Sequence, residues 1–234
     1  MTSLFNLFSI HTIIWHFNIG AGYDMSYIEA IGTLFGLTNI WLAAKEKYLN
    51  FYFGLVNVVL FGLIFYQIQL YANLLLQIFF FIMNLYGLYS WRNLSNQDNL
   101  KIHWLGRKLI ILIGLISITA IIGLSICINQ IFVILTNVAT QILSLFDKSI
   151  HLPNLELDQH PIIDSTILVL SIVAMILMTR KAVENWLIWC LINLLSIWLY
   201  STQNVDLMSI EYVILLLIAI KGSIDWINKA KDKH

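Results

Sequence analysis

The 234-residue sequence has little charge, little proline and little cysteine. Only 11% of its residues are Asp, Glu, Lys or Arg, against about 25% in an average soluble domain. In contrast, 59% are hydrophobic. A chain of this composition cannot cover itself with a water-compatible surface, which excludes a soluble globular protein. With two prolines and no polar block, it leaves little room for a separate soluble domain, and it is predicted to be a polytopic membrane protein.

Other absences narrow the function. The formal net charge is zero, so the chain has no basic footprint for nucleic acid. Cys127 and Cys190 lie in apolar segments and are predicted to be small hydrophobic residues, with no disulfide and no metal site. The sequence has no Gly-rich phosphate loop, zinc pattern or serine elbow. We therefore expect no cofactor and no enzymatic activity.

Seven apolar segments approach the roughly 20 residues needed to cross a bilayer. They are residues 28–44, 51–68, 72–90, 109–128, 162–179, 186–202 and 208–226. Residues 129–146 continue the fourth segment, which predicts one long helix or a helix pair ahead of a polar loop. Within residues 1–20, the stretch 3–19 holds two histidines and two asparagines. We expect an extra N-terminal helix that spans the membrane there; a helix lying in the interface is the alternative.

Positive charge gathers in the connections on one side of the predicted membrane helices. It follows the first, third and fifth core segments and recurs at the C-terminus: Lys45, Lys47, Arg92, Lys101, Arg107, Lys108, Arg180, Lys181, Lys229, Lys231 and Lys233. The connections on the other side carry only Lys148, among acidic residues. The positive-inside rule therefore places the basic side, with the C-terminus, in the cytoplasm.

The two halves of the chain resemble each other at a spacing of 135 residues. Over 65 residues without a gap, this shift aligns Glu29 with Asp164, Lys45 with Arg180, Asn50 with Asn185, Phe51 with Trp186, Gly87 with Gly222, Trp91 with Trp226 and Asn93 with Asn228. It predicts two parallel three-helix repeats, residues 28–93 and 162–228, joined by a linker helix within residues 109–146 (3+1+3), before a cytoplasmic tail of residues 229–234. Transporters with such repeats hold their substrate between the halves, near the membrane midplane.

Polar and aromatic side chains lie at depth within these segments. Trp186, Trp189 and Asn193 are spaced i, i+3, i+7, which places two indoles and an amide on one helical stripe. Three more amides lie inside other segments: Asn57, Gln77 and Asn84. A polar group that faces lipid costs free energy, so each must face protein or a water-filled cavity. Two indoles beside amides suit a flat, polar, heteroaromatic ligand, and these six residues are the predicted binding site.

A structural interpretation competes for some of these residues. Asn57 is equally suited to a hydrogen bond with a neighbouring helix, and we expect Asn39 and Asn137 to make such bonds. Trp186 begins its segment and also fits the interfacial belt. Four tryptophans are predicted to lie in that belt: Trp41, Trp91, Trp198 and Trp226.

Carboxylates are absent from the middles of the segments, because Glu29, Asp164, Glu211 and Asp225 all lie toward ends. A proton or sodium relay usually needs carboxylates at depth, so an ion-coupled mechanism has little support. No Lys or Arg cluster lies at the midplane, so a phosphate would find no partner there.

Four long blocks of the sequence are IGAGYDMSYIEAIGT (19–33), FGLVNVVLFGLIFYQIQLYANLLLQIFFF (53–81), MNLYGLYSW (83–91) and LSIVAMILMTRKAVENWLIWCLIN (170–193). These blocks resemble the bacterial nicotinamide riboside transporters of the PnuC family. The tryptophan–tryptophan–asparagine signature of the family matches Trp186, Trp189 and Asn193 without a gap.

The resemblance implies nicotinamide riboside uptake across the inner membrane of a bacterium. It also implies a 3+1+3 core related in design to the sugar-transporting SWEET proteins, an extra N-terminal helix, a homotrimer, and facilitated diffusion with a cytoplasmic kinase that traps the product. A pyridinium cation fits the tryptophans through cation–π attraction. Thiamine is also a flat cation and stays the alternative ligand. An intramembrane enzyme or a scaffolding subunit is less consistent with the residues, because no nucleophile–base pair converges at depth and a scaffold leaves the tryptophan stripe without a purpose.

The charge pattern makes a prediction about topology. A reporter fused after His234 should be cytoplasmic, and a tag inserted near Asn154 should lie on the opposite face, because the basic connections stay inside. Protease accessibility in intact spheroplasts measures both. Digestion of the C-terminal reporter in unbroken spheroplasts would contradict the orientation.

Overall fold

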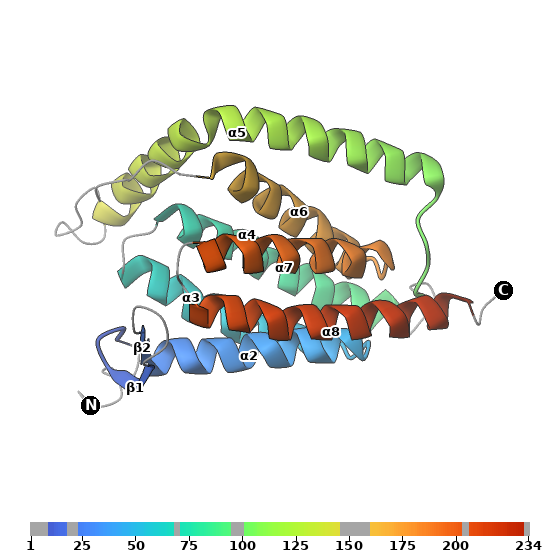
Figure 1. Cartoon of the computed structure of the whole chain (residues 1–234), viewed down its shortest axis with the longest axis horizontal. Helices are drawn as coiled ribbons and strands as arrows, with labels where there is room; N and C mark the ends of the chain where they lie inside the picture. The colour runs from blue at the N-terminus through green and yellow to red at the C-terminus, as the bar shows by residue number, and fades with distance from the viewer. Residues whose placement is uncertain are drawn as a thin grey trace.

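The computed structural model describes residues 9–17, 23–67, 71–94, 101–145, 160–202 and 206–231. In this part of the chain a short hairpin precedes a bundle of α-helices (Figure 1). The helices are α2 (Tyr27–Ala44), α3 (Asn50–Gln67), α4 (Tyr71–Tyr89) with a π-helical turn η1 (Ser90–Leu94), α5 (Arg107–Ser144), α6 (Pro161–Thr179), α7 (Glu184–Thr202) and α8 (Asp206–Lys231). The fold is that of a multi-pass, helical membrane protein.

Five stretches of helix in the described residues are long and apolar enough to cross a membrane. They are α2, α3, residues Arg107–Ile131 of α5, α6 and α7. The helix α5 is continuous over 38 residues, about 57 Å at 1.5 Å per residue, so the predicted fourth segment and its extension form one helix. It lies along one side of the bundle and contacts α4 and α6 (Figure 1).

The prediction of an N-terminal helix is wrong for residues 9–17. Residues Ile13–Phe17 form strand β1, which pairs antiparallel with β2 (Tyr23–Ser26). The strand carries two isoleucines and two aromatic residues, types that favour extended backbone, and His16 Nδ1 lies 2.5 Å from Asp24 Oδ1 across the pair. The remainder of the predicted helix lies outside the described residues.

The helices before and after α5 follow the 135-residue shift. Adding 135 to the bounds of α2, α3 and α4 gives 162–179, 185–202 and 206–224, against Pro161–Thr179, Glu184–Thr202 and Asp206–Lys231 for α6, α7 and α8. We call α2–α4 the first unit and α6–α8 the second unit. Equivalent helices run in the same direction (Figure 1).

The two units also end their first helices in the same way. Glu46 N–H donates to the Ala43 carbonyl and Lys47 N–H to that of Leu42, and the residues 135 further on repeat both bonds. This pattern is a Schellman motif, in which one residue adopts a left-handed conformation, usually glycine. Here those residues are Glu46 (φ 59°) and Lys181 (φ 55°). The turn geometry is therefore shared although neither unit has a glycine at the position.

In each unit an aromatic residue of the second helix packs on a glycine of the third. Phe51 lies directly over Gly87. Trp186 lies over Gly222, where an added Cβ would come within 2.7 Å of its ring. Both aromatic side chains are fully buried. Only a residue without a side chain leaves this space, so the glycines set how closely the helices approach.

The prediction that Trp91 and Trp226 lie in the interfacial belt is wrong. They are 2% and 0% exposed and contact each other at 5.9 Å between ring centroids. Each indole N–H crosses to the other unit, from Trp91 to the Met178 carbonyl and from Trp226 to the Ala44 carbonyl, both at 3.2 Å. A buried indole needs such an acceptor, and the C-terminal turns of α2 and α6 supply these carbonyls. We call this end of the bundle, formed by residues 45–49, 90–94, 180–183 and 227–231, the basic end.

The packing of aromatic residues on glycines makes a prediction about stability. Gly222→Ala should lower the free energy of unfolding by about 1–3 kcal/mol, because the methyl group overpacks against Trp186. Gly123→Ala on α5 is the matched control, since an added Cβ there meets nothing within 4 Å and alanine favours helix by up to about 1 kcal/mol. Thermal unfolding of the purified protein in detergent measures both. Equal melting temperatures in the two variants would contradict the packing argument.

Candidate functional site

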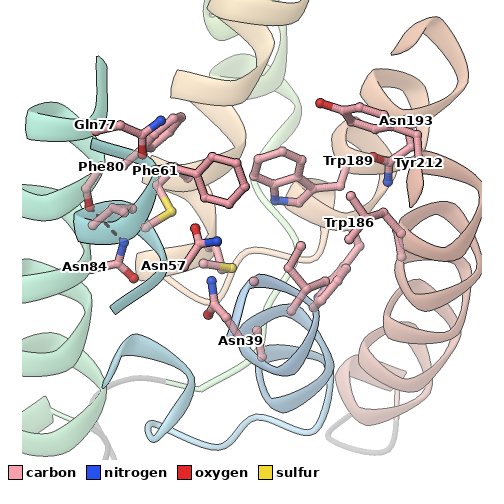
Figure 2. A pocket seen from close by; sticks show the side chains of 18 residues that line it. Asn39, Asn57, Phe61, Gln77, Phe80, Asn84, Trp186, Trp189, Asn193 and Tyr212 are labelled. Atoms are coloured by element: carbon pink, nitrogen blue, oxygen red, sulfur yellow. Dashed lines mark hydrogen bonds between the residues drawn. The ribbon is translucent and has the colours of Figure 1, made fainter. Parts of the chain in front are cut away.

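A cavity of about 240 Å³ lies between the two units, and eighteen residues from α2, α3, α4, α6, α7 and α8 line it (Figure 2). This volume is slightly below the about 300–1,000 Å³ that ligand pockets commonly measure. The cavity therefore suits a small molecule and is too small for a peptide or a lipid. All six residues of the predicted binding site line it: Trp186, Trp189, Asn193, Asn57, Gln77 and Asn84. The structure therefore brings together residues that lie up to 136 positions apart in the sequence.

The first unit contributes an amide wall. Asn39 of α2, Asn57 of α3, and Gln77 and Asn84 of α4 lie on the same side of the cavity (Figure 2). Asn57 Nδ2 donates to the Gly32 carbonyl of α2 at 2.8 Å, and Asn84 Nδ2 donates to the Phe80 carbonyl at 2.8 Å. Because backbone carbonyls only accept, these bonds fix both amides with their oxygens turned elsewhere. Asn57 thus joins two helices and lines the cavity as well.

The orientation of Asn84 depends on a glycine. Its Oδ1 lies against Gly54 of α3, where a Cβ would collide with it, and Asn39 Nδ2 lies 3.2 Å from the same Cβ position. Within the described residues, neither Asn84 Oδ1 nor Asn39 Oδ1 has a hydrogen-bond partner although both are buried. Unpaired buried acceptors cost free energy.

The second unit contributes an aromatic wall. Trp189 points from α7 toward the side of the cavity where Phe61 and Phe80 lie, and Tyr212 of α8 lies beside Asn193 (Figure 2). Trp189 is half-buried. Trp186 is 0% exposed, seated on Gly222 and packed edge-on against Trp226 at 5.7 Å between centroids. The two tryptophans of the stripe therefore differ: Trp189 is half-buried and reaches into the cavity, and Trp186 supports the wall from within the core.

Cavity positions related by the 135-residue shift carry different chemistry. Asn84 corresponds to Ala219, Gln77 to Tyr212, Val58 to Asn193, Phe80 to Leu215, Ile40 to Met175 and Ala43 to Met178, and all of these residues line the cavity. Wherever one unit has an amide, the other has an apolar or aromatic residue. The cavity is thus symmetric in backbone and asymmetric in chemistry, as an asymmetric ligand requires.

Some lining residues were not among those predicted from the sequence. Asn39 was expected only to join helices, yet it lines the cavity. Its spacing from Gly36 and Ala43 places all three on one face of α2, and this spacing could have been read from the sequence. Tyr212 lies near the start of α8 and gave no sign of depth in the sequence. Phe61 and Phe80 do not differ in type from other phenylalanines of the chain, so only their place in the fold identifies them.

The cavity holds no charge. Of the eighteen described residues that line it, none is Asp, Glu, Lys, Arg or His. In the described part of the chain no three His, Cys, Asp or Glu residues come together in a way that would hold a metal ion. Recognition of a ligand here rests on amide hydrogen bonds and aromatic faces.

Two parallel three-helix units around a central cavity are the arrangement of membrane transporters with parallel repeats. Comparison with known families identifies which one: residues 26–228 match the family described as nicotinamide mononucleotide transporter. The chain belongs to this family, and its similarity to PnuC transporters is confirmed.

Relatives in several bacteria support the assignment. The chain is 48% identical over 231 residues to the nicotinamide riboside transporter PnuC of Escherichia coli (strain K12), and equally to that of Shigella flexneri, covering 97% of each chain. It is 22% identical over 219 residues to the nicotinamide riboside transporter PnuC of Neisseria mucosa, covering 88% of this chain and 74% of that one. The solved "Crystal structure of the Vitamin B3 transporter PnuC" has the same fold, with a TM-score of 0.62 at 21% identity over 89% of this chain and 83% of that one.

Proposed function

We propose that this protein carries nicotinamide riboside across the bacterial inner membrane by facilitated diffusion. The observation that carries the proposal is the uncharged cavity with an amide wall on one unit and an aromatic wall on the other. The pyridinium cation of the ligand stacks on Trp189, where a cation–π contact is worth about 0.5–2 kcal/mol. The carboxamide and ribose hydroxyls exchange hydrogen bonds with the amides of Asn57, Gln77, Asn84 and Asn193.

The chemistry of the cavity favours the riboside over the mononucleotide. The family description names the mononucleotide, whereas the curated relatives are named for the riboside. A phosphate carries about −1.5 to −2 charge and needs Arg, Lys or a metal ion as a partner, and no described lining residue supplies one. The same property explains trapping: once a cytoplasmic kinase has phosphorylated the riboside, the product no longer fits the pathway.

In this proposal the two units act as the repeats of a 3+1+3 transporter. The helices α2–α4 and α6–α8 cross the membrane, α5 links them, and the cavity lies near the midplane. The basic end, with the C-terminus, faces the cytoplasm because its lysines and arginines are retained inside. We also propose a homotrimer, as the family resemblance implies, in a bilayer that covers the exposed apolar faces.

The binding site predicts the effect of two substitutions. Trp189→Ala and Asn193→Ala should each weaken nicotinamide riboside binding by about 5–30-fold, because each loses a contact of about 1–2 kcal/mol. Trp189→Phe should lose less. Trp198→Ala is the matched control, since Trp198 lies on the same helix, is 49% exposed and does not line the cavity. Calorimetry with purified protein measures affinity, with thiamine as the competing ligand.

Unchanged affinity in both alanine variants would show that the tryptophan stripe contributes to packing and not to ligand binding. Tighter binding of thiamine than of nicotinamide riboside would show that thiamine is the ligand, and the proposal of a transporter would still hold. Trp186→Ala is unsuitable for this comparison, because Trp186 is part of the core and its loss should cost about 3–5 kcal/mol of stability.

Energy coupling gives a further prediction. In proteoliposomes the inside-to-outside ratio of labelled nicotinamide riboside should reach one and stay there under an imposed pH or sodium gradient, because no described cavity residue is a carboxylate that could bind the coupling ion. Protein-free liposomes are the control, and nicotinamide mononucleotide should not exchange. A ratio well above one under either gradient would point instead to Glu29, Glu211 or Asp225.

A further inference from the structure

Two side-chain pairs at the basic end join residues that correspond to each other in the two units. Glu46 corresponds to Lys181, and Lys181 Nζ lies 2.7 Å from Glu46 Oε1. Trp91 corresponds to Trp226, and their rings are in contact. In an arrangement with approximate two-fold symmetry, a residue that touches its own counterpart lies on the axis. Both pairs therefore lie on the line that relates the two units.

The cavity lies around the same line, and the pairs close one end of it. Several of its lining residues are counterparts of one another, among them Ala43 with Met178. Glu46 follows Ala43 by three residues, and Lys181 follows Met178 by three, so both lie in the turns that end α2 and α6 at the basic end. A ligand that leaves the cavity between the two units at this end must pass both pairs.

The ion pair is well enclosed. The Lys181 side chain is 3% exposed and the Glu46 side chain 26%, and Lys181 Nζ lies 5.0 Å from the Trp91 ring centroid. Glu46 Oε2 also accepts from Lys229 of α8 at 3.1 Å. Burial raises the pKa of Glu46, but the hydrogen bonds and charges of Lys181 and Lys229 outweigh burial and lower it below its ordinary value. The Glu46 carboxyl is therefore ionised at neutral pH.

We propose that Glu46 and Lys181 form the latch of an inner gate, which holds the two units together at the basic end and opens when the ligand leaves on that side. The inference rests on the proposed transport function in requiring that the units separate. Opposite charges are needed because identical charges meeting on the axis would repel. This accounts for the opposite charges of Glu46 and Lys181, whose backbone conformations are the same.

A buried ion pair suits a gate that must open often. The desolvation of the two ions nearly cancels their attraction, so separating them into water costs little. Loss of one partner is different, because the remaining ion keeps its cost of burial and loses the attraction of that partner. A variant with a single charge should thus favour the open gate, in which the remaining charge reaches water.

The test uses Ala219→Cys as a reporter, in a background that carries Cys127→Ser and Cys190→Ser. Ala219 is 1% exposed and lines the cavity. Vesicles whose C-terminal tag is accessible to protease present the basic end outward, and a membrane-impermeant maleimide then reports opening at that end. Glu46→Gln and Lys181→Met should each raise the labelling rate about tenfold, which corresponds to about 1.4 kcal/mol. The exchange Glu46→Lys with Lys181→Glu, made together with Lys229→Glu so that position 229 again opposes the charge at position 46, should restore the slow rate.

Lys108→Gln is the control, since Lys108 is an exposed lysine of α5, and it should label slowly. Unchanged labelling in folded single variants would overturn the latch, as would fast labelling of the exchanged pair. If the single variants failed to fold while the exchanged pair folded, the ion pair would be a permanent structural contact. This result would also overturn the latch. Because labelling uses no ligand, failure of nicotinamide riboside to bind would be a separate result.

Discussion

The approach of the helices in this bundle depends on the packing of two large aromatic side chains onto glycines. Phe51 and Trp186 each fill the space that Gly87 and Gly222 leave on the next helix of their unit. Without a Cβ on those glycines, the second and third helices of each unit come close enough for Trp91 and Trp226 to meet between the units. The indole N–H groups then bond carbonyls of the opposite unit. In lipid, the hydrophobic effect does not drive helices to associate. Close packing and such hydrogen bonds must therefore supply the free energy of association.

The same packing explains why the cavity lies where it does. At the basic end Trp91, Trp186 and Trp226 pack together. Further along, amides and aromatic residues of both units line a space that stays open. Trp91 and Trp226 keep their chemistry from one unit to the other, while three pairs of equivalent cavity positions carry an amide in one unit only. The two units thus share a frame and differ in the cavity.

The sequence was most informative where a pattern repeats along the helices. Apolar length predicted the core helices to within a few residues at most ends, and the 135-residue spacing matched landmarks that prove to be packing partners, such as Gly222 with Trp186. It failed where local and tertiary preferences compete. Residues 13–17 are apolar enough for a helix, but their β-branched and aromatic types, and a partner strand at residues 23–26, favour a hairpin.

The sequence by itself determined that the chain belongs in a membrane, which residues carry charge, and which amides and tryptophans lie at depth. Only the tertiary structure decided what each of these does. Trp91 and Trp226 have the composition and position of interfacial residues, yet they are core residues, because each is opposite its counterpart. Asn39 and Trp189 reach the cavity because their helices rotate those faces inward. A side chain's depth follows from its distance along its own helix; the direction it faces depends on the packing of all the others.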